Sequence, residues 1–444
     1  MKGTNLGHNN PLKNRAFWSD TLAAAPSLQS PAPLPAAIGL APGQRFDVAV
    51  VGGGYTGLAA ARQLARAGAS VVVLERGPIG SGASSRNAGQ VLTGLKLEPA
   101  TLVANYGESR AKELFNVSDR AITELERLVA DERIECELLR TGHLQAAAKR
   151  SHFAAFRDEQ ALLARVFNHD VSLIPEADQA SELGARGYHG LLLDEHSWAL
   201  NPAKYVAGLA EAAARAGASL APHTRVEQVS RASGLWSIRT TGGIVGAKDV
   251  LFATNGYTDH ASPALQRRLI PIGSYIIVTA PLGDAVAARL LPKRRMAFDS
   301  RHFLHYFRLT ADNRLLFGGR AEFSGPTLES AKRAEAILQH AMTSTFPELA
   351  DIRIDYAWSG HVAFTRDQMP HAGLLDGAFY AGGYAGHGIA LATHLGATIA
   401  RRIAGEPISH PMFDDHFAPI PLYYGRPWFL PFVGLYYRWL DWIS

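Results

Sequence analysis

The segment from residue 46 to residue 95 constrains the fold of this chain more than any other. An apolar run over 46–51 leads directly into a glycine-rich turn over 52–57, and a helix-compatible segment follows over 58–68. A second apolar run over 70–75 ends in an acid. A strand, a glycine turn, a helix and a second strand form a βαβ unit, which places a helix N-terminus beside the end of a parallel strand. The pattern therefore predicts a dinucleotide-binding turn rather than a simple connection.

The spacing of this motif gives each of its residues a physical task. Gly52 makes the tight turn, Gly54 lets the backbone approach a pyrophosphate, and Gly57 lets the helix pack closely on the strand. The helix N-terminus offers unpaired N–H groups to the phosphates. Glu75 lies 18 residues past Gly57, where a carboxylate can hydrogen-bond an adenosine ribose hydroxyl. That carboxylate disfavours NADP, whereas this unit alone leaves NAD and FAD open.

Composition and charge describe a globular chain without a polyanionic partner. Of its 444 residues, 47% are hydrophobic and 19% are charged, which suits two or three domains. The formal net charge is only +4, and no basic stripe extends beyond residues 293–295. We therefore expect no nucleic acid as a partner. Cys136 is the one cysteine, which excludes an intrachain disulfide and a metal site built from several cysteines.

The two ends of the chain differ from its middle. Residues 21–43 are rich in alanine and proline, which predicts an extended arm, and the start lacks the pattern of a signal peptide. We expect a cytoplasmic protein without a segment that spans a bilayer. The aromatic tail at 427–443 is either an interfacial membrane anchor or a final segment packed on the protein. Packing is favoured, because Pro431, Arg438 and Asp441 interrupt the apolar run.

Periodicity along the remaining chain predicts alternating helices and strands, and so an α/β (mixed α+β) fold. Amphipathic spacing predicts helices over 108–132, 150–168, 202–216, 328–345 and 389–404. Alternating or apolar runs predict strands over 137–146, 274–279, 302–308, 315–319 and 378–382. Nucleotide-type turns at both ends of the chain indicate a discontinuous nucleotide domain interleaved with a β-rich substrate domain. The predicted boundaries are 1–45 for an N-terminal arm, 46–95, 185–268 and 346–410 for the nucleotide domain, 96–184 and 269–345 for the substrate domain, and 411–444 for the tail.

A second glycine-rich segment follows the βαβ unit directly. Residues 80–90 read Gly-Ser-Gly-Ala-Ser-Ser-Arg-Asn-Ala-Gly-Gln. A flavin needs small residues where its ring passes the backbone, whereas an NAD enzyme needs no such loop at this point. A flexible linker would not require Arg86 and Asn87, which add specific hydrogen-bonding groups to the run. The segment therefore favours FAD.

Three motifs together resemble the D-amino-acid oxidase/glycine oxidase superfamily of FAD enzymes. They are the turn at 51–57, the loop at 82–90 and the turn Gly-Tyr-Ala-Gly-His-Gly at 383–388. Within the superfamily the γ-glutamylputrescine oxidoreductase branch is most similar, and the segment 306–318 adds to that likeness. The resemblance covers the chain from about residue 15 to the aromatic tail. It implies a Rossmann-type FAD-binding domain and a small-molecule amine or amino acid as substrate.

The resemblance also implies which residues hold the cofactor. The glycine turn would bind the pyrophosphate, Glu75 and Arg76 would flank the adenosine, and the loop at 84–89 would run along the isoalloxazine. The implied cofactor residues are Gly52, Gly54, Tyr55, Thr56, Gly57, Glu75, Arg76, Ser84, Ser85, Arg86, Asn87, Gly89, Val226, Thr254, Gly383, Tyr384, Gly386, Gly388 and Ile389. Cys136 lies far in sequence from these motifs. We therefore expect non-covalent FAD.

The turn at 383–389 has a second implied task, at the N1–C2=O edge of the flavin. Reduced flavin carries negative charge there, and a helix N-terminus stabilises negative charge. His387 lies in this turn. It either hydrogen-bonds flavin or substrate, or it is a satisfied turn histidine, and the sequence leaves both readings open. His361 is interpreted as structural.

Candidates for the substrate wall come from the β-rich domain: Tyr275, His305, Tyr306 and Arg308. Tyr306 and Arg308 are two residues apart, so they share one face of a strand. Arg308 could bind a substrate carboxylate, or it could be a solvent-facing arginine beside a core tyrosine. The similar family carries an acidic and aromatic pair where this chain has His305 and Phe307. This departure argues against a polyamine-derived substrate with a distal ammonium.

The expected activity is oxidation of an amine or amino-acid C–N bond to an imine by hydride transfer to flavin N5, then hydrolysis, with oxygen as the electron acceptor and peroxide as the product. A dehydrogenase that passes electrons to a quinone or carrier is the main alternative. An NAD-dependent dehydrogenase and a flavoprotein without catalytic activity are weaker alternatives. The sequence does not determine the oligomeric state.

Overall fold

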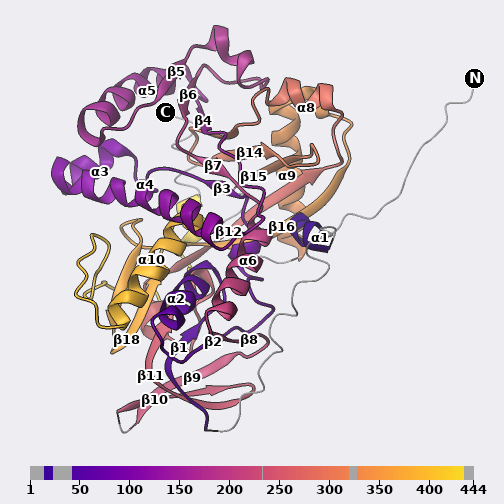
Figure 1. Ribbon diagram of the computed structural model, residues 1–444. Coiled ribbons are helices and arrows are strands. Elements are labelled where there is room, and N and C mark those ends of the chain that lie inside the picture. The colour runs from indigo at the N-terminus through magenta and orange to yellow at the C-terminus, as the bar shows by residue number, and fades with distance from the viewer. Residues whose placement is uncertain (1–14, 24–42, 233, 320–327, 435–444) are drawn as a thin grey trace, which may run out of the picture.

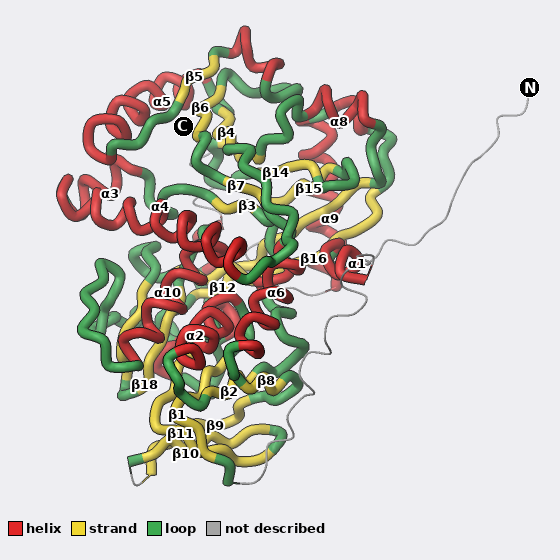
Figure 2. The backbone as a smooth tube through the Cα atoms, in the orientation of Figure 1, coloured by secondary structure: helices red, strands yellow, loops and turns green. Residues whose placement is uncertain are grey.

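The fold is that of a computed structural model that describes residues 15–23, 43–232, 234–319 and 328–434. It consists of two lobes, each built on an eight-stranded sheet, and the chain passes between them repeatedly (Figure 1). Helices lie against the sheets of both lobes (Figure 2). The predicted mixed α/β class is confirmed. Among the helices of these ranges, none has the length and hydropathy that crossing a membrane requires.

The first sheet contains the predicted βαβ unit. β1 (Arg45–Val51) lies between β2 (Val71–Leu74) and β11 (Gly243–Phe252), parallel to both. α2 (Tyr55–Arg66) connects β1 to β2. The strand order is β17-β18-β11-β1-β2-β8, and β9 and β10 extend the sheet from β11. The other strands of this sheet are β8 (Ser219–Ala221), β9 (Val226–Ala232), β10 (Leu235–Thr240), β17 (His371–Leu375) and β18 (Ala378–Gly382).

Strand register brings the carboxyl ends of the central strands to one edge. Val51 of β1 pairs with Leu74 of β2 and with Phe252 of β11. In open parallel sheets this edge is where ligands bind. α2 and α10 (Gly388–Ile403) both begin near it, and α6 (Pro202–Arg215) packs beside α2.

Close approach of helix to strand and helix to helix depends on missing side chains. A Cβ atom at Gly57 would lie 1.9 Å from the carbonyl oxygen of Gly52. A Cβ atom at Gly396 of α10 would lie 2.3 Å from the carbonyl oxygen of Thr56 in α2. The sequence-based task of Gly57 in packing is therefore confirmed, and Gly396 has the same task one helix further on.

The second sheet runs in the order β16-β12-β15-β14-β13-β4-β6-β5. Its strands are β4 (His143–Ala146), β5 (Ser172–Ile174), β6 (Leu191–Asp194), β12 (Ile270–Thr279), β13 (Met296–Asp299), β14 (His305–Leu309), β15 (Leu315–Gly319) and β16 (Ile354–Phe364). α8 (Asp284–Leu290) and α9 (Leu328–Thr345) cover one face, where Phe307 stacks on Phe317 with ring centroids 5.6 Å apart. The opposite face turns toward the first lobe.

Further elements lie outside these two sheets. They are α3 (Pro99–Tyr106), α4 (Glu108–Asp131), α5 (Arg150–Leu162) with a π-helical turn over Leu163–Phe167, the short strands β3 (Gln90–Val91) and β7 (Trp198–Ala199), and the short helix α7 (Pro263–Gln266). The predicted helices at 108–132, 202–216 and 389–404 are confirmed within one or two residues. The predicted strand at 137–146 is wrong in its first half, because Glu137 has a left-handed φ of 55°, which breaks extended pairing.

Two predicted boundaries fall between strands that pair with each other. β6 pairs with β4, and β16 pairs with β12, so both belong to the second sheet. The boundaries at 185 and 346 had assigned their residues to the nucleotide domain. Pairing between strands that lie 45 or more residues apart in the sequence decides this membership, and local sequence does not reveal it.

The N-terminal arm is not extended where the structure describes it. Phe17–Ala23 form the helix α1, and Trp18 is 1% exposed. Its indole N–H donates to the carbonyl oxygen of Asn87 at 2.9 Å. The predicted extended arm at 21–43 is therefore wrong for residues 21–23, while residues 24–42 lie outside the described residues.

Candidate active site

A large cavity lies between the two sheets. Its volume is about 1320 Å³, above the roughly 300–1,000 Å³ of a usual small-molecule pocket. The carboxyl ends of β1, β2 and β11 line one end, and β4, β12 and β13 of the second sheet line the other. The loop at 81–88 and the turn at 384–389 lie between these ends. Each lobe thus supplies one wall, an arrangement that suits a cofactor on one side and a substrate on the other.

The glycine turn and Glu75 form the first end of the cavity. The Glu75 carboxylate accepts the backbone N–H of Gly53 at 2.8 Å and that of Gly77 at 3.0 Å. These bonds hold the carboxylate at the end of β2, beside the N-terminus of α2. Arg76 lies over the Tyr257 ring, 5.2 Å from its centroid. Negative and positive groups therefore flank the position where an adenosine ribose would lie.

The loop at 81–90 is fixed by hydrogen bonds to α2. The Ser84 hydroxyl accepts the N–H of Tyr55 at 3.0 Å, and the Tyr55 hydroxyl donates to the Ser84 carbonyl at 2.5 Å. The Asn87 amide donates to the carbonyls of Ala83 and Ser84, and its oxygen accepts the N–H of Gly89. A loop of small residues thus has a defined conformation along the cavity, as a linker would not.

The turn before α10 approaches the cavity from the opposite side. The Tyr384 and Thr56 hydroxyls are hydrogen-bonded at 2.7 Å, which joins this turn to α2. The N–H of Gly383 donates to the Asn255 side chain at 2.9 Å. The N-termini of α2 and α10 are therefore held together at one edge of the sheet, and both offer N–H groups to an anion.

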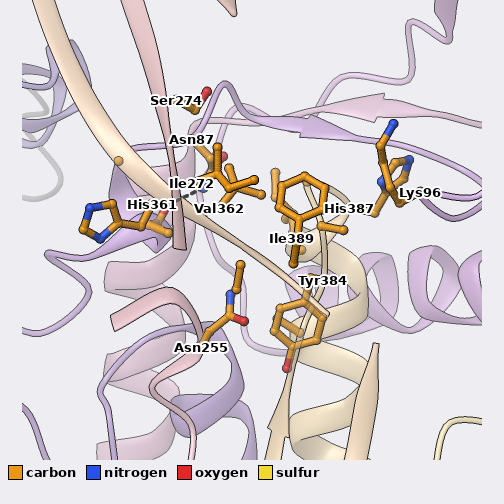
Figure 3. A pocket seen from close by; sticks show the side chains of 18 of the residues that line it. Asn87, Lys96, Asn255, Ile272, Ser274, His361, Val362, Tyr384, His387 and Ile389 are labelled. Carbon is orange, nitrogen blue, oxygen red and sulfur yellow. Dashed lines mark hydrogen bonds between the residues drawn. The ribbon is translucent and has the colours of Figure 1, made fainter. Parts of the chain in front are cut away.

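His387 lines the cavity at the start of α10. Figure 3 shows it on the side of the pocket where Lys96 lies, away from His361. Burial, together with the nearby Lys96 and His143, lowers the pKa of His387 to about 3. Its Nδ1 atom is buried without a hydrogen-bond partner among the described residues. The neutral imidazole is thus available to a bound molecule, which favours the functional reading of this residue.

Most of the cofactor residues implied by the resemblance meet at this cavity. It is lined by Gly52, Gly54, Tyr55, Thr56, Glu75, Arg76, Ser84, Arg86, Asn87, Val226, Thr254, Tyr384, Gly386, Gly388 and Ile389. The other four implied residues, Gly57, Ser85, Gly89 and Gly383, are not among the lining residues. Cys136 is 1% exposed in the core beneath α6, and burial raises the pKa of its thiol to about 12.

The expectation that Arg308 binds a substrate carboxylate is corrected by its surroundings. Arg308 is 3% exposed, and its Nη1 donates to the carbonyls of Gly89 at 2.7 Å and Leu200 at 2.9 Å. The guanidinium also lies 5.7 Å from the Trp18 ring centroid. It binds the end of the 81–90 loop from outside the cavity. Tyr306 and Arg308 share a strand face, as predicted, but the end of the 81–90 loop lies between the Arg308 guanidinium and the cavity.

The other three candidates divide between the two faces of their strands. Tyr306 lines the cavity, and its hydroxyl is hydrogen-bonded to Ser274 at 3.0 Å. Tyr275 is 2% exposed and belongs to the core beneath α9. The His305 ring contacts that of Phe317 at a tilt of 34°, and its Nδ1 lies 3.3 Å from the buried Asp299 carboxylate. Neither of the latter two reaches the cavity, because alternate strand residues point to opposite faces.

The sequence analysis missed the polar residues of the far wall. His143 and Gln145 of β4 line the cavity, and His143 stacks on Phe298 with centroids 5.2 Å apart. Burial lowers the pKa of His143. Behind it, His169 is hydrogen-bonded to the buried Asp194 carboxylate at 2.7 Å. Polar residues two apart in a short strand were a usable signal for His143 and Gln145.

Comparison with known proteins places these observations in a family. Residues 47–402 match the family described as FAD dependent oxidoreductase. The chain belongs to this family. The γ-glutamylputrescine oxidoreductase of Escherichia coli is 33% identical over 395 residues, which cover 88% of this chain and 90% of that protein. The glycine oxidase of Geobacillus kaustophilus is 27% identical over 384 residues, covering 80% and 92%.

Solved structures share the fold of this FAD dependent oxidoreductase. The glycine oxidase structure from Geobacillus kaustophilus superposes with a TM-score of 0.71 at 22% identity, covering 83% of this chain and 96% of that one. L-proline dehydrogenase from P. horikoshii gives 0.68 at 19% identity, covering 84% and 96%. The predicted Rossmann-type FAD fold and the predicted superfamily are confirmed.

The residues at the cavity fit the cofactor of this family. FAD is an extended dinucleotide with an anionic centre, and the cavity has two adjacent helix N-termini near its middle. The Glu75 carboxylate lies at the adenosine end, and the unpartnered Nδ1 of His387 lies at the other. The protein is thus an oxidoreductase that uses FAD.

Proposed function

We propose that this protein oxidises the C–N bond of an amine or amino acid to an imine, which water hydrolyses, with oxygen as the final electron acceptor and peroxide as a product. FAD, when bound, supplies the hydride acceptor at its N5 atom. The observation that carries the proposal is the continuous cavity, which joins the cofactor residues to a polar wall on the second sheet. The names of the similar proteins, an oxidoreductase of γ-glutamylputrescine and a glycine oxidase, agree with such substrates.

The chain's own residues would orient the substrate rather than react with it. The neutral imidazole of His387 can hydrogen-bond an amine without repelling it. Tyr306, His143 and Gln145 offer hydrogen bonds from the opposite wall. Flavin amine oxidation requires the uncharged amine, and burial of the reacting amine in the cavity disfavours its charged form.

A carboxylate pair at the outer part of the cavity supports a cationic substrate. Glu98 and Glu159 both line it. Burial and the nearby Glu98 raise the pKa of Glu159 to about 7. A substrate ammonium beside this pair would favour the ionised form of Glu159. The presence of His305 where the similar family carries an acid therefore does not exclude a substrate with a distal ammonium, against the sequence-based expectation.

Non-covalent attachment of FAD is part of the proposal. The Cys136 thiol does not line the cavity, and its raised pKa keeps it protonated. Acid precipitation should release the flavin completely into the supernatant. A washed precipitate that remains yellow would contradict this expectation.

The test of the function begins with the absorption spectrum of the purified protein, which should show bound flavin. Anaerobic addition of primary amines, secondary amines, amino acids and γ-glutamylated polyamines should then bleach the flavin with at least one class. Admission of oxygen should restore the yellow colour and produce one molecule of peroxide for each reduced flavin. If no amine bleaches the flavin, the proposed activity is wrong.

A dehydrogenase is the second candidate, on account of the aromatic tail. Phe429, Leu430 and Val433 line the cavity, beside side chains of the tail that are exposed to solvent. A lipid-soluble quinone could therefore reach the cavity along an apolar path. Slow reoxidation by oxygen with fast reoxidation by a quinone would favour this candidate. A cytoplasmic location is part of the proposal for both candidates. The dehydrogenase would work at the cytoplasmic face of the membrane, whereas the oxidase would not need a membrane.

A further inference from the structure

The C-terminal segment carries the densest group of exposed apolar side chains in the described protein. Eight large hydrophobic side chains are exposed within the described ranges, and four of them fall within eleven residues. These four, here called the aromatic patch, are Leu422, Tyr424, Trp428 and Phe432, with exposed fractions of 73%, 69%, 61% and 67%. Single exposed apolar residues are ordinary, whereas a contiguous group marks an interaction surface.

The aromatic patch is held in place from behind. The buried Tyr423 donates its hydroxyl proton to the Leu269 carbonyl at 2.9 Å. Leu430 is 5% exposed and packs with Ile272 and Phe364 of the second sheet. The Trp428 ring contacts that of Phe429, with centroids 5.7 Å apart. The exposed side chains therefore belong to a packed segment with one inner and one outer face.

Within the segment that carries the patch, residues 416–434, the ionised side chains are of one sign. Residues 416–434 contain no aspartate or glutamate. Arg426 is exposed, and the Arg267 guanidinium lies 4.7 Å from the centroid of the Tyr424 ring. The sequence of the ten residues after 434 contains four aromatic residues, one arginine and one aspartate. Aromatic rings together with arginines are typical of segments that lie at the boundary between lipid tails and anionic headgroups.

We propose that the aromatic patch docks this protein on the surface of an anionic lipid bilayer. Trp428 and Phe432 would enter the interfacial region, while Arg426 and Arg267 would lie against headgroup phosphates. The inference goes beyond the proposed function, because docking requires no turnover. It has a consequence for that function, since Phe429 and Leu430 on the inner face of the same segment line the cavity.

The test uses the full-length, FAD-loaded protein and vesicles of two compositions. Vesicles of phosphatidylcholine with phosphatidylglycerol should sediment the protein, and vesicles of phosphatidylcholine alone should sediment much less. The double variant Trp428→Ser with Phe432→Ser should bind the anionic vesicles about tenfold more weakly. Arg426→Glu should also weaken binding and reduce its dependence on salt. The matched control is Ile244→Ser with Ile337→Ser, which removes two exposed apolar residues elsewhere and should leave binding unchanged.

Flavin content, read from absorbance, shows whether each variant is folded. The proposal is overturned if the wild-type protein sediments with neither kind of vesicle, or if the control pair weakens binding as much as the patch variant. It is also overturned if size-exclusion chromatography with light scattering shows a wild-type dimer that the patch variant dissociates. In that case a second copy of the chain covers the patch. Since vesicle binding is measured without substrate, its failure is distinguishable from failure of the proposed function.

Discussion

Arg308 shows how a buried cation can serve a cofactor site without facing the cofactor. Burial lowers its pKa to about 10, so the guanidinium remains charged at neutral pH and needs its carbonyl partners. Arg308→Met should remove the charged donor from the carbonyls of Gly89 and Leu200. The Gly89 carbonyl keeps the N–H of Leu200 at 2.9 Å, so we expect the free energy of unfolding to fall by about 1–3 kcal/mol, chiefly through the Leu200 carbonyl. Flavin affinity should fall, while KM for a carboxylate-bearing amine changes little. Denaturant unfolding and steady-state kinetics measure both quantities.

The opposite pattern would restore the first interpretation of Arg308. A variant with unchanged unfolding and flavin content, but a KM at least tenfold higher for carboxylate-bearing amines alone, would show that the guanidinium contacts the substrate.

His410 belongs to a chain of hydrogen bonds outside the active site. Its Nδ1 accepts the N–H of Met412 at 3.2 Å, so its Nε2 donates to the Nε2 of His394 at 3.0 Å. His394 then donates from Nδ1 to the Glu124 carboxylate at 2.6 Å. This arrangement needs a neutral His410. Burial, and then the neighbouring His394 and Arg120, lowers its pKa from 6.5 to about 3.

The lowered pKa of His410 predicts a loss of stability in acid. Since the unfolded chain binds this proton more tightly, the contribution is fully present above about pH 6.5 and is lost as pH falls toward 3. The slope from one such group is at most about 1.4 kcal/mol per pH unit, less where solvent screens it. His410→Gln keeps a donor for His394, so unfolding between pH 4 and 7 should depend less steeply on pH. The exposed His260→Gln should leave the slope unchanged, and equal slopes in all three proteins would contradict the assignment.

At the scale of elements, the contact between α2 and α10 aligns the two helix N-termini that face the cofactor. Alanine normally stabilises a helix interior relative to glycine by about 1 kcal/mol. Gly396→Ala should instead destabilise the protein by about 2 kcal/mol, because its Cβ would lie 2.3 Å from the Thr56 carbonyl oxygen. Flavin content should fall with it. Gly283→Ala, at a position with open space around it, is the control, and a more stable Gly396→Ala would show that the helices separate freely.

Local patterns predicted most elements but not their partners. The glycine turn, the amphipathic runs and the cap residues specify α2, α4, α6 and α10 because they act within a few residues of one another. Neither glycine nor proline flanks Glu137, so the sequence gives no sign of its left-handed backbone. The strand predicted over 137–146 was therefore too long. Residues 354–364 were placed in the nucleotide domain, because only the pairing of β16 with β12, some 80 residues away, shows that they belong to the second sheet.

At the scale of the molecule, the cofactor end of the site was more predictable than the substrate end, where the sequence indicated Tyr306 but not His143 or Gln145. Cofactor contacts come from turns whose sequence reflects backbone geometry, so the motifs around Glu75 and Gly383 could be recognised. The far wall is assembled from His143 and Gln145 on β4 and Tyr306 on β14, and its shape follows from sheet order. The same assembly displaced Arg308 from the role that its strand position suggested.

Because the cavity is lined by both lobes, FAD should stabilise the molecule as a whole. Removal of FAD should lower the unfolding temperature, and added FAD at 100 times its Kd should restore about 2.7 kcal/mol. Flavin fluorescence and far-ultraviolet circular dichroism should then report one coincident transition. Riboflavin lacks the adenosine half that Glu75 and the N-terminus of α2 would hold. Riboflavin at the same concentration as FAD should therefore raise the unfolding temperature much less. An equal shift with riboflavin would show that the glycine turn is not the anchor of the cofactor.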